Sequence, residues 1–198
     1  MSQVAIIKAT YGEVLYAQKF NDDVTPINRL RGHAVIQALK DNVSLAYADL
    51  VDVDLSNLAL DNRSFHNVEF HNANLSSINF SDSNFSFCIF DYANLSGSLL
   101  RNVYIDNSRF YKTLMARADI NGANVFHGGG IIDAGIDNRG YRFIGINYGE
   151  EWMVKAGCRW FSIENAKHHW EVGPNHDALA RVGVIEAGMK EINLFPIY

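Results

Sequence analysis

The sequence predicts a mainly β protein whose middle is a solenoid, with a small cap of strands and helices on each side. The main observation is a bulky apolar residue at every fifth position from Leu45 to Val125, without a polar exception. A step of five fits neither a flat strand, whose side chains repeat every two residues, nor a helix, which turns about 100° per residue. A fixed period held for this long indicates units that bury their apolar faces by stacking on one another.

A second column of residues supports the same period. Two residues before each apolar anchor the side chain is small or apolar, as at Ala48, Val53 and Ala73, and only Arg63 breaks the column. The residue between the two columns is often Asp or Asn. The period therefore specifies two inward positions in every five residues.

This pattern resembles the A-[D/N]-L-x-x repeat of the pentapeptide-repeat family across residues 43–127, with AYADL, HNANL and DYANL as examples. The resemblance implies a right-handed quadrilateral β-helix of about four coils, in which each pentapeptide forms one side. Residues twenty apart then lie on the same side. The implied columns are Leu50, Phe70, Phe90 and Phe110 on one side and Leu45, Phe65, Phe85, Ile105 and Val125 on another.

Residues 1–42 are predicted to form an N-terminal ββα cap, because the open end of a β-helix exposes core and unpaired backbone. Residues 4–20 indicate a hairpin that turns at Thr10–Glu13. Residues 26–40 indicate an amphipathic helix with Thr25 as N-cap and Pro26 in its first turn. The helix residues expected to pack on the first coil are Ile27, Leu30, Val35, Ile36 and Leu39.

Residues 128–198 are predicted to form a C-terminal ββαα module. The Gly-rich stretch 127–140 is expected to be an irregular exit from the solenoid, and residues 141–161 a hairpin that turns near Tyr148–Glu151. Ser162 is expected to cap a helix through Trp170, and residues 175–192 to form another. These flanks, with an AGC-x-x-F stretch at 156–161, resemble those of phage- and prophage-encoded members of the family.

The composition is that of a soluble globular protein, with 48% hydrophobic and 20% charged residues in a chain of 198. The start does not resemble a signal peptide, and no run approaches the ~18 apolar residues needed to cross a bilayer. Two cysteines, Cys88 and Cys158, fit a reducing compartment. We therefore expect a cytoplasmic protein without membrane contact, in a host cell if it is phage-encoded.

Few residues suggest chemistry. Cys158 with His168 or His169 permits a cysteine–histidine reading, but no acid or oxyanion element has recognisable spacing, and a small core cysteine is the favoured alternative. His168, His169 and His176 match no standard metal site. The glycines at 128–130 lack the Lys-Ser/Thr of a phosphate loop. We expect no enzyme activity, no cofactor and no resident metal.

The surface of the repeat region suggests binding. Its N-terminal part is acidic, and its outward aromatic residues gather on two adjoining sides, either as a docking surface or, as we favour, covered by the terminal segments. The candidate binding residues are Asp49, Asp52, Asp54, Asp61, Glu69, Asp82, Asp91, Tyr47, Phe87, Tyr92, Tyr104 and Tyr111.

These features favour a non-enzymatic protein, phage- or prophage-encoded, whose acidic rod imitates DNA and inhibits a host nucleic-acid-handling or defence complex. The partner would be a protein rather than nucleic acid, and a homo-oligomer is left open. One alternative is a structural or assembly protein of a virion. Another, implied by the resemblance, is a protein that protects DNA gyrase, although the basic residues of the last coils and the C-terminal cap weaken that analogy: Arg101, Arg109, Lys112 and Arg117.

Overall fold

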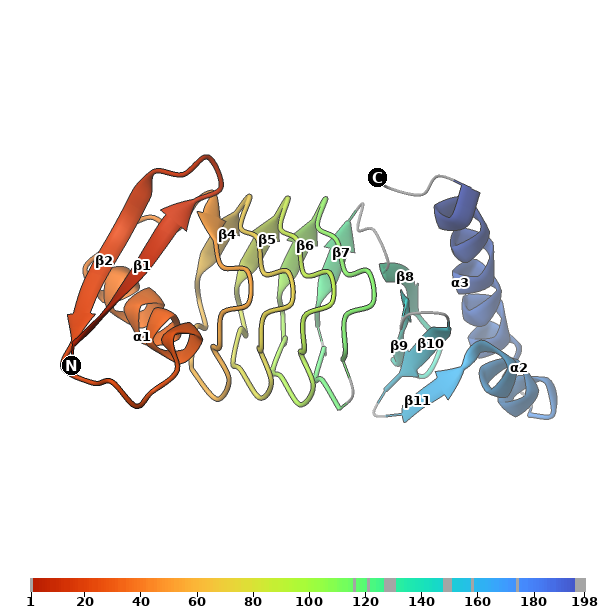
Figure 1. Cartoon of the computed structure of the whole chain (residues 1–198). Coiled ribbons are helices and arrows are strands. Elements are labelled where there is room, and N and C mark those ends of the chain that lie inside the picture. Colours follow the sequence, from red (N-terminus) through yellow and green to blue (C-terminus); the bar gives the residue numbers. More distant parts are fainter. Residues whose placement is uncertain are drawn as a thin grey trace.

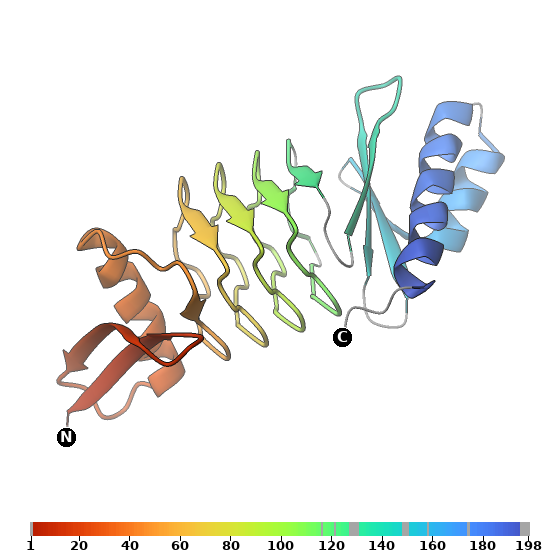
Figure 2. The same ribbon diagram turned by 90° about the horizontal axis from the view of Figure 1, so that it is seen from above.

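The parts of the protein follow one another along one axis. The computed structural model describes residues 2–115, 117–120, 122–126, 131–147, 151–157, 159–173 and 175–194, with their side chains except at 124–126 and 191–194. A hairpin and a helix lie at the N-terminal end, the coils lie in the middle, and a sheet backed by two helices lies at the C-terminal end (Figure 1). Figure 2 shows the C-terminal sheet standing between the last coil and those helices.

The repeat region is built from parallel ladders with a register of twenty residues. Strands β4 (Ser64–His66), β5 (Asn84–Ser86), β6 (Tyr104–Asp106) and β7 (Asn124–Phe126) pair in parallel along the first side. Three further ladders have the same shift, and we number their sides second, third and fourth: Asp49–Glu69–Ile89–Arg109, Asp54–Asn74–Asn94–Leu114 and Ala59–Asn79–Leu99–Asp119. One turn of the chain therefore takes twenty residues and has four sides, as expected, while the hand of the coil stays a prediction.

The anchors of the five-residue period form the core. From Leu45 to Ile120 every one is at most 5% exposed, and the side chain of the last, Val125, lies outside the described residues. Phenylalanine rings stack along the axis, with centroids 4.9 Å apart for Phe70 and Phe90 and 4.7 Å apart for Phe90 and Phe110. Each buried aromatic ring contributes a few kcal/mol, since apolar burial is worth about 25 cal/mol per Å².

Each corner of the coil contains a residue in the left-handed backbone region, two positions after an anchor. This region suits Asn, Asp and Gly and disfavours bulkier residues. Asn and Asp account for most of the non-glycine residues at these corners, and the others include three aromatic and two basic residues. The corner residues with positive φ other than glycine are Tyr47, Asp52, Asn57, Asn62, Asn67, Asn72, Ser77, Asp82, Phe87, Tyr92, Asn102, Asn107, Lys112 and Arg117.

The N-terminal cap has the predicted ββα order. Strands β1 (Gln3–Ala9) and β2 (Val14–Phe20) form an antiparallel hairpin that turns at residues 10–13, and α1 spans Ile27–Lys40. Strand β1 also pairs with β3 (Ala48–Asp49), so the hairpin continues the second side of the first coil. Leu30, Ala34 and Val35 of the helix are buried in the same core as the anchors.

Two predictions about α1 are wrong. Pro26, not Thr25, is its N-cap, because the Thr25 hydroxyl and the Thr25 and Val24 backbone N–H groups donate to the carboxylate of Asp22 instead. Ile27 is 47% exposed rather than packed on the coil, because the buried part of α1 begins only at Leu30.

Arginines of α1 complete the open edge of the first coil. In later coils, a carbonyl oxygen accepts from the backbone N–H nineteen residues earlier, as His71 does from Asp52. The first coil has no earlier coil, and the Arg31 guanidinium donates to the carbonyls of Asp49 (2.7 Å) and Val51 (2.8 Å) in its place. Arg29 donates to the Ser56 carbonyl (2.8 Å). The cap therefore satisfies acceptors that would otherwise be buried without partners.

The C-terminal module differs from the prediction, because it has four strands before its two helices. Strands β8 (Ile131–Ile136), β9 (Arg142–Asn147), β10 (Trp152–Ala156) and β11 (Arg159–Ser162) form an antiparallel sheet in the order β11-β10-β9-β8. Residues 131–136 are therefore a strand and not part of an irregular exit. Of the other predicted exit residues, 137–140 form the turn between β8 and β9, and 127–130 lie outside the described residues. Most of the expected hairpin turn, 148–150, also lies outside them.

The C-terminal sheet is apolar on both faces, which explains its place between the solenoid and the helices. Ile131, Ile144 and Ile146 join the solenoid core. Phe143 and Val154 pack with α2 (Ile163–Glu171) and α3 (His176–Leu194). Both helices agree with the sequence, and Ser162 caps α2 by accepting from the Asn165 N–H.

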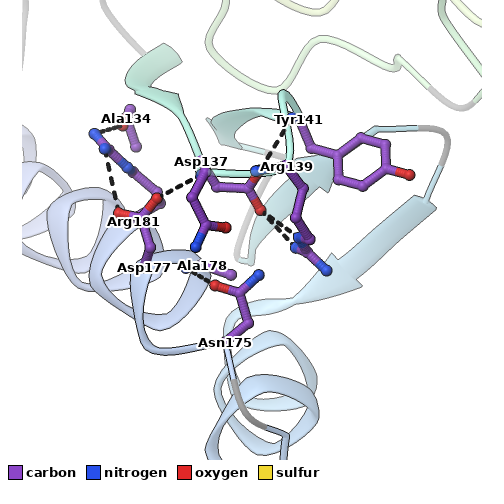
Figure 3. Close-up of polar contacts among 9 residues, drawn as sticks. Ala134, Asp137, Arg139, Tyr141, Asn175, Asp177, Ala178 and Arg181 are labelled. Carbon is purple, nitrogen blue, oxygen red and sulfur yellow. Dashed lines mark hydrogen bonds and ion pairs between the residues drawn. The ribbon is translucent and has the colours of Figure 1, made fainter.

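A polar network ties the β8–β9 turn to α3 (Figure 3). The Asp137 carboxylate accepts from the backbone N–H of Arg139 and Tyr141 and forms an ion pair with the Arg139 guanidinium. On α3, Arg181 forms an ion pair with Asp177 and donates to the Ala134 carbonyl. Because these contacts join the turn to the helix, we assign the network a structural role.

Candidate protein-binding surface

The predicted carboxylates do not share one face of the solenoid. Asp49, Asp52, Glu69 and Asp91 lie on the second side or its corner with the third, and Asp54 lies on the third side. Asp61 and Asp82 lie at the corner between the fourth side and the first. Because the acids are spread around the coil, they do not form a single strip of charge.

Two of these carboxylates form ion pairs with arginines of the same chain. Asp54 accepts from the Ser56 N–H and forms an ion pair with Arg29 (3.4 Å). Burial would raise the pKa of Asp54, but these contacts hold it below its usual value. Asp91 is buried, forms an ion pair with Arg109 and accepts from the Tyr111 N–H. Both acids therefore serve the fold, whatever else they contact.

A first aromatic row runs along the corner between the first and second sides. It consists of Tyr11, Tyr47, His66 and Phe87, and it begins on the hairpin turn. The centroids of Tyr47 and His66 are 5.8 Å apart, and those of His66 and Phe87 are 5.6 Å apart, both edge to face. Tyr11 lies 6.2 Å from Tyr47. The row thus links the cap to three successive coils.

A second aromatic row runs along the next corner and consists of His71, Tyr92 and Tyr111. Tyr92 lies 5.3 Å from His71 and 5.6 Å from Tyr111, again with tilted or edge-to-face rings. The Lys112 ammonium lies over both tyrosine rings, 5.8 Å from Tyr92 and 5.3 Å from Tyr111. These ring faces therefore already contact a cation of the chain itself.

The described parts of the terminal segments leave the aromatic candidates largely exposed, so the favoured interpretation that these segments cover them is wrong. Their exposed fractions lie between 41% and 49%, and the physical reason is that both caps stack on the ends of the solenoid rather than along its sides (Figure 1). The residues concerned are Tyr47, Phe87, Tyr92, Tyr104 and Tyr111. Tyr104 lies on the first side, in β6, and the other four lie in the two rows.

Three of the exposed aromatics occupy backbone positions that disfavour them. Tyr47, Phe87 and Tyr92 have φ of 63°, 58° and 61°, in the left-handed region. A non-glycine residue there costs roughly 1–2 kcal/mol, with Asn and Asp the best tolerated. Sequence reasoning missed this column, although its enrichment in Asn and Asp two residues after each anchor was a usable signal. Strained bulky residues on a surface are a reason to look for function there.

The described residues offer little for catalysis. Cys88 is buried in the core, and burial raises the pKa of its thiol to about 12, so it is protonated at neutral pH. Within the described ranges, no group of three His, Cys, Asp or Glu side chains is placed to hold a metal ion. His169 packs between Phe161 and Trp170. Cys158 lies outside the described residues, so the cysteine–histidine reading stays untested.

Across the described helices, none combines the length and apolarity that a bilayer crossing requires.

The family match to known proteins falls on the repeat region. A family model described as the SV2A/B/C luminal domain matches residues 41–127, less than half of the chain. No curated protein matches. Similar solved structures include alr5209, a pentapeptide repeat protein from Nostoc PCC 7120, with 21% identity over 39% of this chain and 64% of that one and a TM-score of 0.38.

Two further structures match over a similar length. HetL, a pentapeptide repeat protein involved in heterocyst differentiation regulation from Nostoc, is 22% identical over 40% of this chain and 37% of its own, with a TM-score of 0.21. QnrB1, a plasmid-mediated fluoroquinolone resistance protein, is 21% identical over 39% of this chain and 40% of its own, with a TM-score of 0.22. This chain thus spans less than two thirds of the length of each. The description of the fold rests on the ladders of this chain itself.

Proposed function

We propose that this protein is a non-enzymatic binding protein that docks another protein on the second side of its solenoid and the two aromatic rows beside it. The observation that carries the proposal is the exposure of Tyr47, Phe87 and Tyr92 at left-handed corners, where Asn would be more stable. Aromatic residues are enriched in protein interfaces, where they form the main anchors. A rigid scaffold presents them without a cost of ordering a loop.

The finer identity of the partner comes from the sequence and its family resemblance. A phage or prophage origin, cytoplasmic location and inhibition of a host nucleic-acid-handling or defence complex are parts of this proposal. Imitation of DNA has less support than the aromatic rows have, because Asp54 and Asp91 are ion-paired and the acids occupy several sides. We therefore place the main binding energy in the aromatic rows and assign the carboxylates to orientation of the partner.

The test replaces strained aromatics with the residue that the corner prefers. Phe87→Asn and Tyr92→Asn should leave the melting temperature unchanged or raise it, because Asn relieves the backbone strain. The same variants should lose proteins that the wild type captures from bacterial lysate at low salt. Ser77→Asn is the matched control, since Ser77 has the same backbone conformation on the third corner. Identical captured proteins for all four chains would refute the proposal.

A further inference from the structure

The second side of the solenoid has an unusual order of outward residues. Along its centre, the ladder runs Asp49, Glu69, Ile89 and Arg109, so it begins with acids and ends with a base. At its corner with the third side, the left-handed column runs Asp52, Asn72, Tyr92 and Lys112, which repeats that change of sign. Both columns therefore have opposite charges at their two ends.

The corner with the first side adds an alternation of size. Its left-handed column runs Tyr47, Asn67, Phe87 and Asn107, large and small by turns. When such a column faces a second copy of itself running in the opposite direction, each large residue lies opposite a small one. In the corner column that ends at Lys112, reversal likewise places Tyr92 opposite Asn72.

Reversal occurs when two copies of one surface meet about a two-fold axis that crosses the rods. The first coil of one copy then faces the fourth coil of the other, and the second faces the third. Equivalent positions of the repeat meet across the axis, because every coil has the same twenty-residue register. The six facing pairs are Asp49 with Arg109, Glu69 with Ile89, Asp52 with Lys112, Asn72 with Tyr92, Tyr47 with Asn107 and Asn67 with Phe87.

The third and fourth sides lack this arrangement of charges within the described residues. The central ladder of the third side pairs Asp54 with Leu114 on reversal, and that of the fourth pairs Ala59 with Asp119. The left-handed columns of their far corners run Asn57, Ser77, Gly97, Arg117 and Asn62, Asp82, Asn102, Gly122. Neither column has opposite charges at its two ends. Within the described residues, opposite charges at both ends of two columns therefore distinguish the second side from the third and fourth.

We propose that the second side binds a second copy of this chain, antiparallel and side by side. The inference rests on the proposed function, since it names a partner for the same surface. Asp52 forms no ion pair with any described residue, so its charge remains available to Lys112 of a partner copy. Arg109 keeps 33% of its side chain exposed beyond its pair with Asp91, and a guanidinium has donors for two carboxylates.

The contact is small, and this sets its strength. Four coils at about 4.8 Å each give a face about 19 Å long, which is short of a standard protein interface. The dimer is therefore weak, with a Kd on the order of 10–100 µM, and depends on salt because exposed charges hold its ends.

Charge exchange between Asp52 and Lys112 tests the pairing. Both residues occupy the left-handed corner position, so Asp52→Lys and Lys112→Asp each introduce a residue type that this column already tolerates. Asp49 is a less suitable site, because β1 places Lys8 beside it. Each single change creates two like-charge contacts by symmetry and should raise the Kd about tenfold or more. The double variant restores opposite charges and should regain the wild-type Kd.

The measurement is sedimentation velocity of the purified full chain up to about 500 µM, at low salt and at about 0.5 M salt. Asp82→Lys is the matched control, with the same charge change at a left-handed corner away from the second side, and should dimerise like the wild type. Monomeric wild type throughout, a single variant that dimerises normally, or a double variant that does not recover would each overturn the proposal. None of these outcomes involves capture from lysate, so the proposed binding function stands or falls separately.

Discussion

Helix α1 crosses the first coil at Gly32, so closely that a Cβ atom at this residue would overlap the carbonyl oxygen of Asp54. Next to this crossing, the Asp54 backbone N–H donates to the Asn28 carbonyl (3.2 Å). The helix therefore takes the place that an earlier coil would occupy, and the glycine is needed for the approach.

Gly32→Ala should destabilise the protein by about 1–3 kcal/mol, because the helix must move away from the coil. In an exposed helix the same substitution stabilises by up to about 1 kcal/mol. Gly183→Ala on α3, where a Cβ meets nothing within 4 Å, provides that comparison. Chemical denaturation measures both free energies of unfolding, and the same sign for the two variants would contradict the close approach.

Arg31→Ala should lower the free energy of unfolding by about 2–4 kcal/mol, because two partly buried carbonyls lose charge-assisted hydrogen bonds. Lysine cannot bind both acceptors in the same fork, so Arg31→Lys should lie between the wild type and the alanine variant. Arg63→Ala, an exposed arginine of the solenoid, is the control and should change stability by less than about 0.5 kcal/mol. Equal losses at the two arginines would show that the edge of the coil needs no cap.

Phe90→Ala should cost about 3–5 kcal/mol, because its ring stacks on both Phe70 and Phe110 and the cavity reaches three coils. Ser96→Ala on the outward part of the third side should be nearly silent. Thermal melts with hydrogen exchange distinguish local from global loss of structure. Similar melting temperatures for the two variants would refute the assignment of inward and outward columns.

The loop before α1 should respond to acid through Asp22. Hydrogen bonds from Thr25 and Val24 lower the pKa of Asp22 to about 2 in the folded protein. A depressed pKa stabilises the fold above the unfolded value near 4, and this stabilisation is lost as the pH falls from about 4 to about 2. The difference in melting temperature between the wild type and Asp22→Asn should therefore close over that range.

Thr25→Val removes the largest of these hydrogen bonds and should give the same pH dependence as Asp22→Asn. A difference that persists at pH 2 for both variants would mean that the Asp22 carboxylate does not hold the loop.

Part of the candidate surface could be found from the sequence and part could not. The outward aromatics were identified because the period assigns every residue to a side. Their contacts were not, since His66 meets Phe87 only through a register that joins residues twenty-one apart. The carboxylates were predicted as one acidic feature, but the partner of Asp54 is an arginine of the N-terminal helix, which the repeat does not specify.

The sequence by itself determined the solenoid and its core, because a five-residue period repeats the same burial at every step and local pattern is enough to define it. The tertiary structure alone decided how the ends are closed and which outward side chains meet. The sequence does not distinguish Arg31 from the other arginines of the chain. Its role becomes visible only from the positions of the Asp49 and Val51 carbonyls, to which it donates. The strand at 131–136 exists because a sheet placed between the last coil and two helices can bury apolar residues on both faces, a condition that no local stretch of sequence expresses.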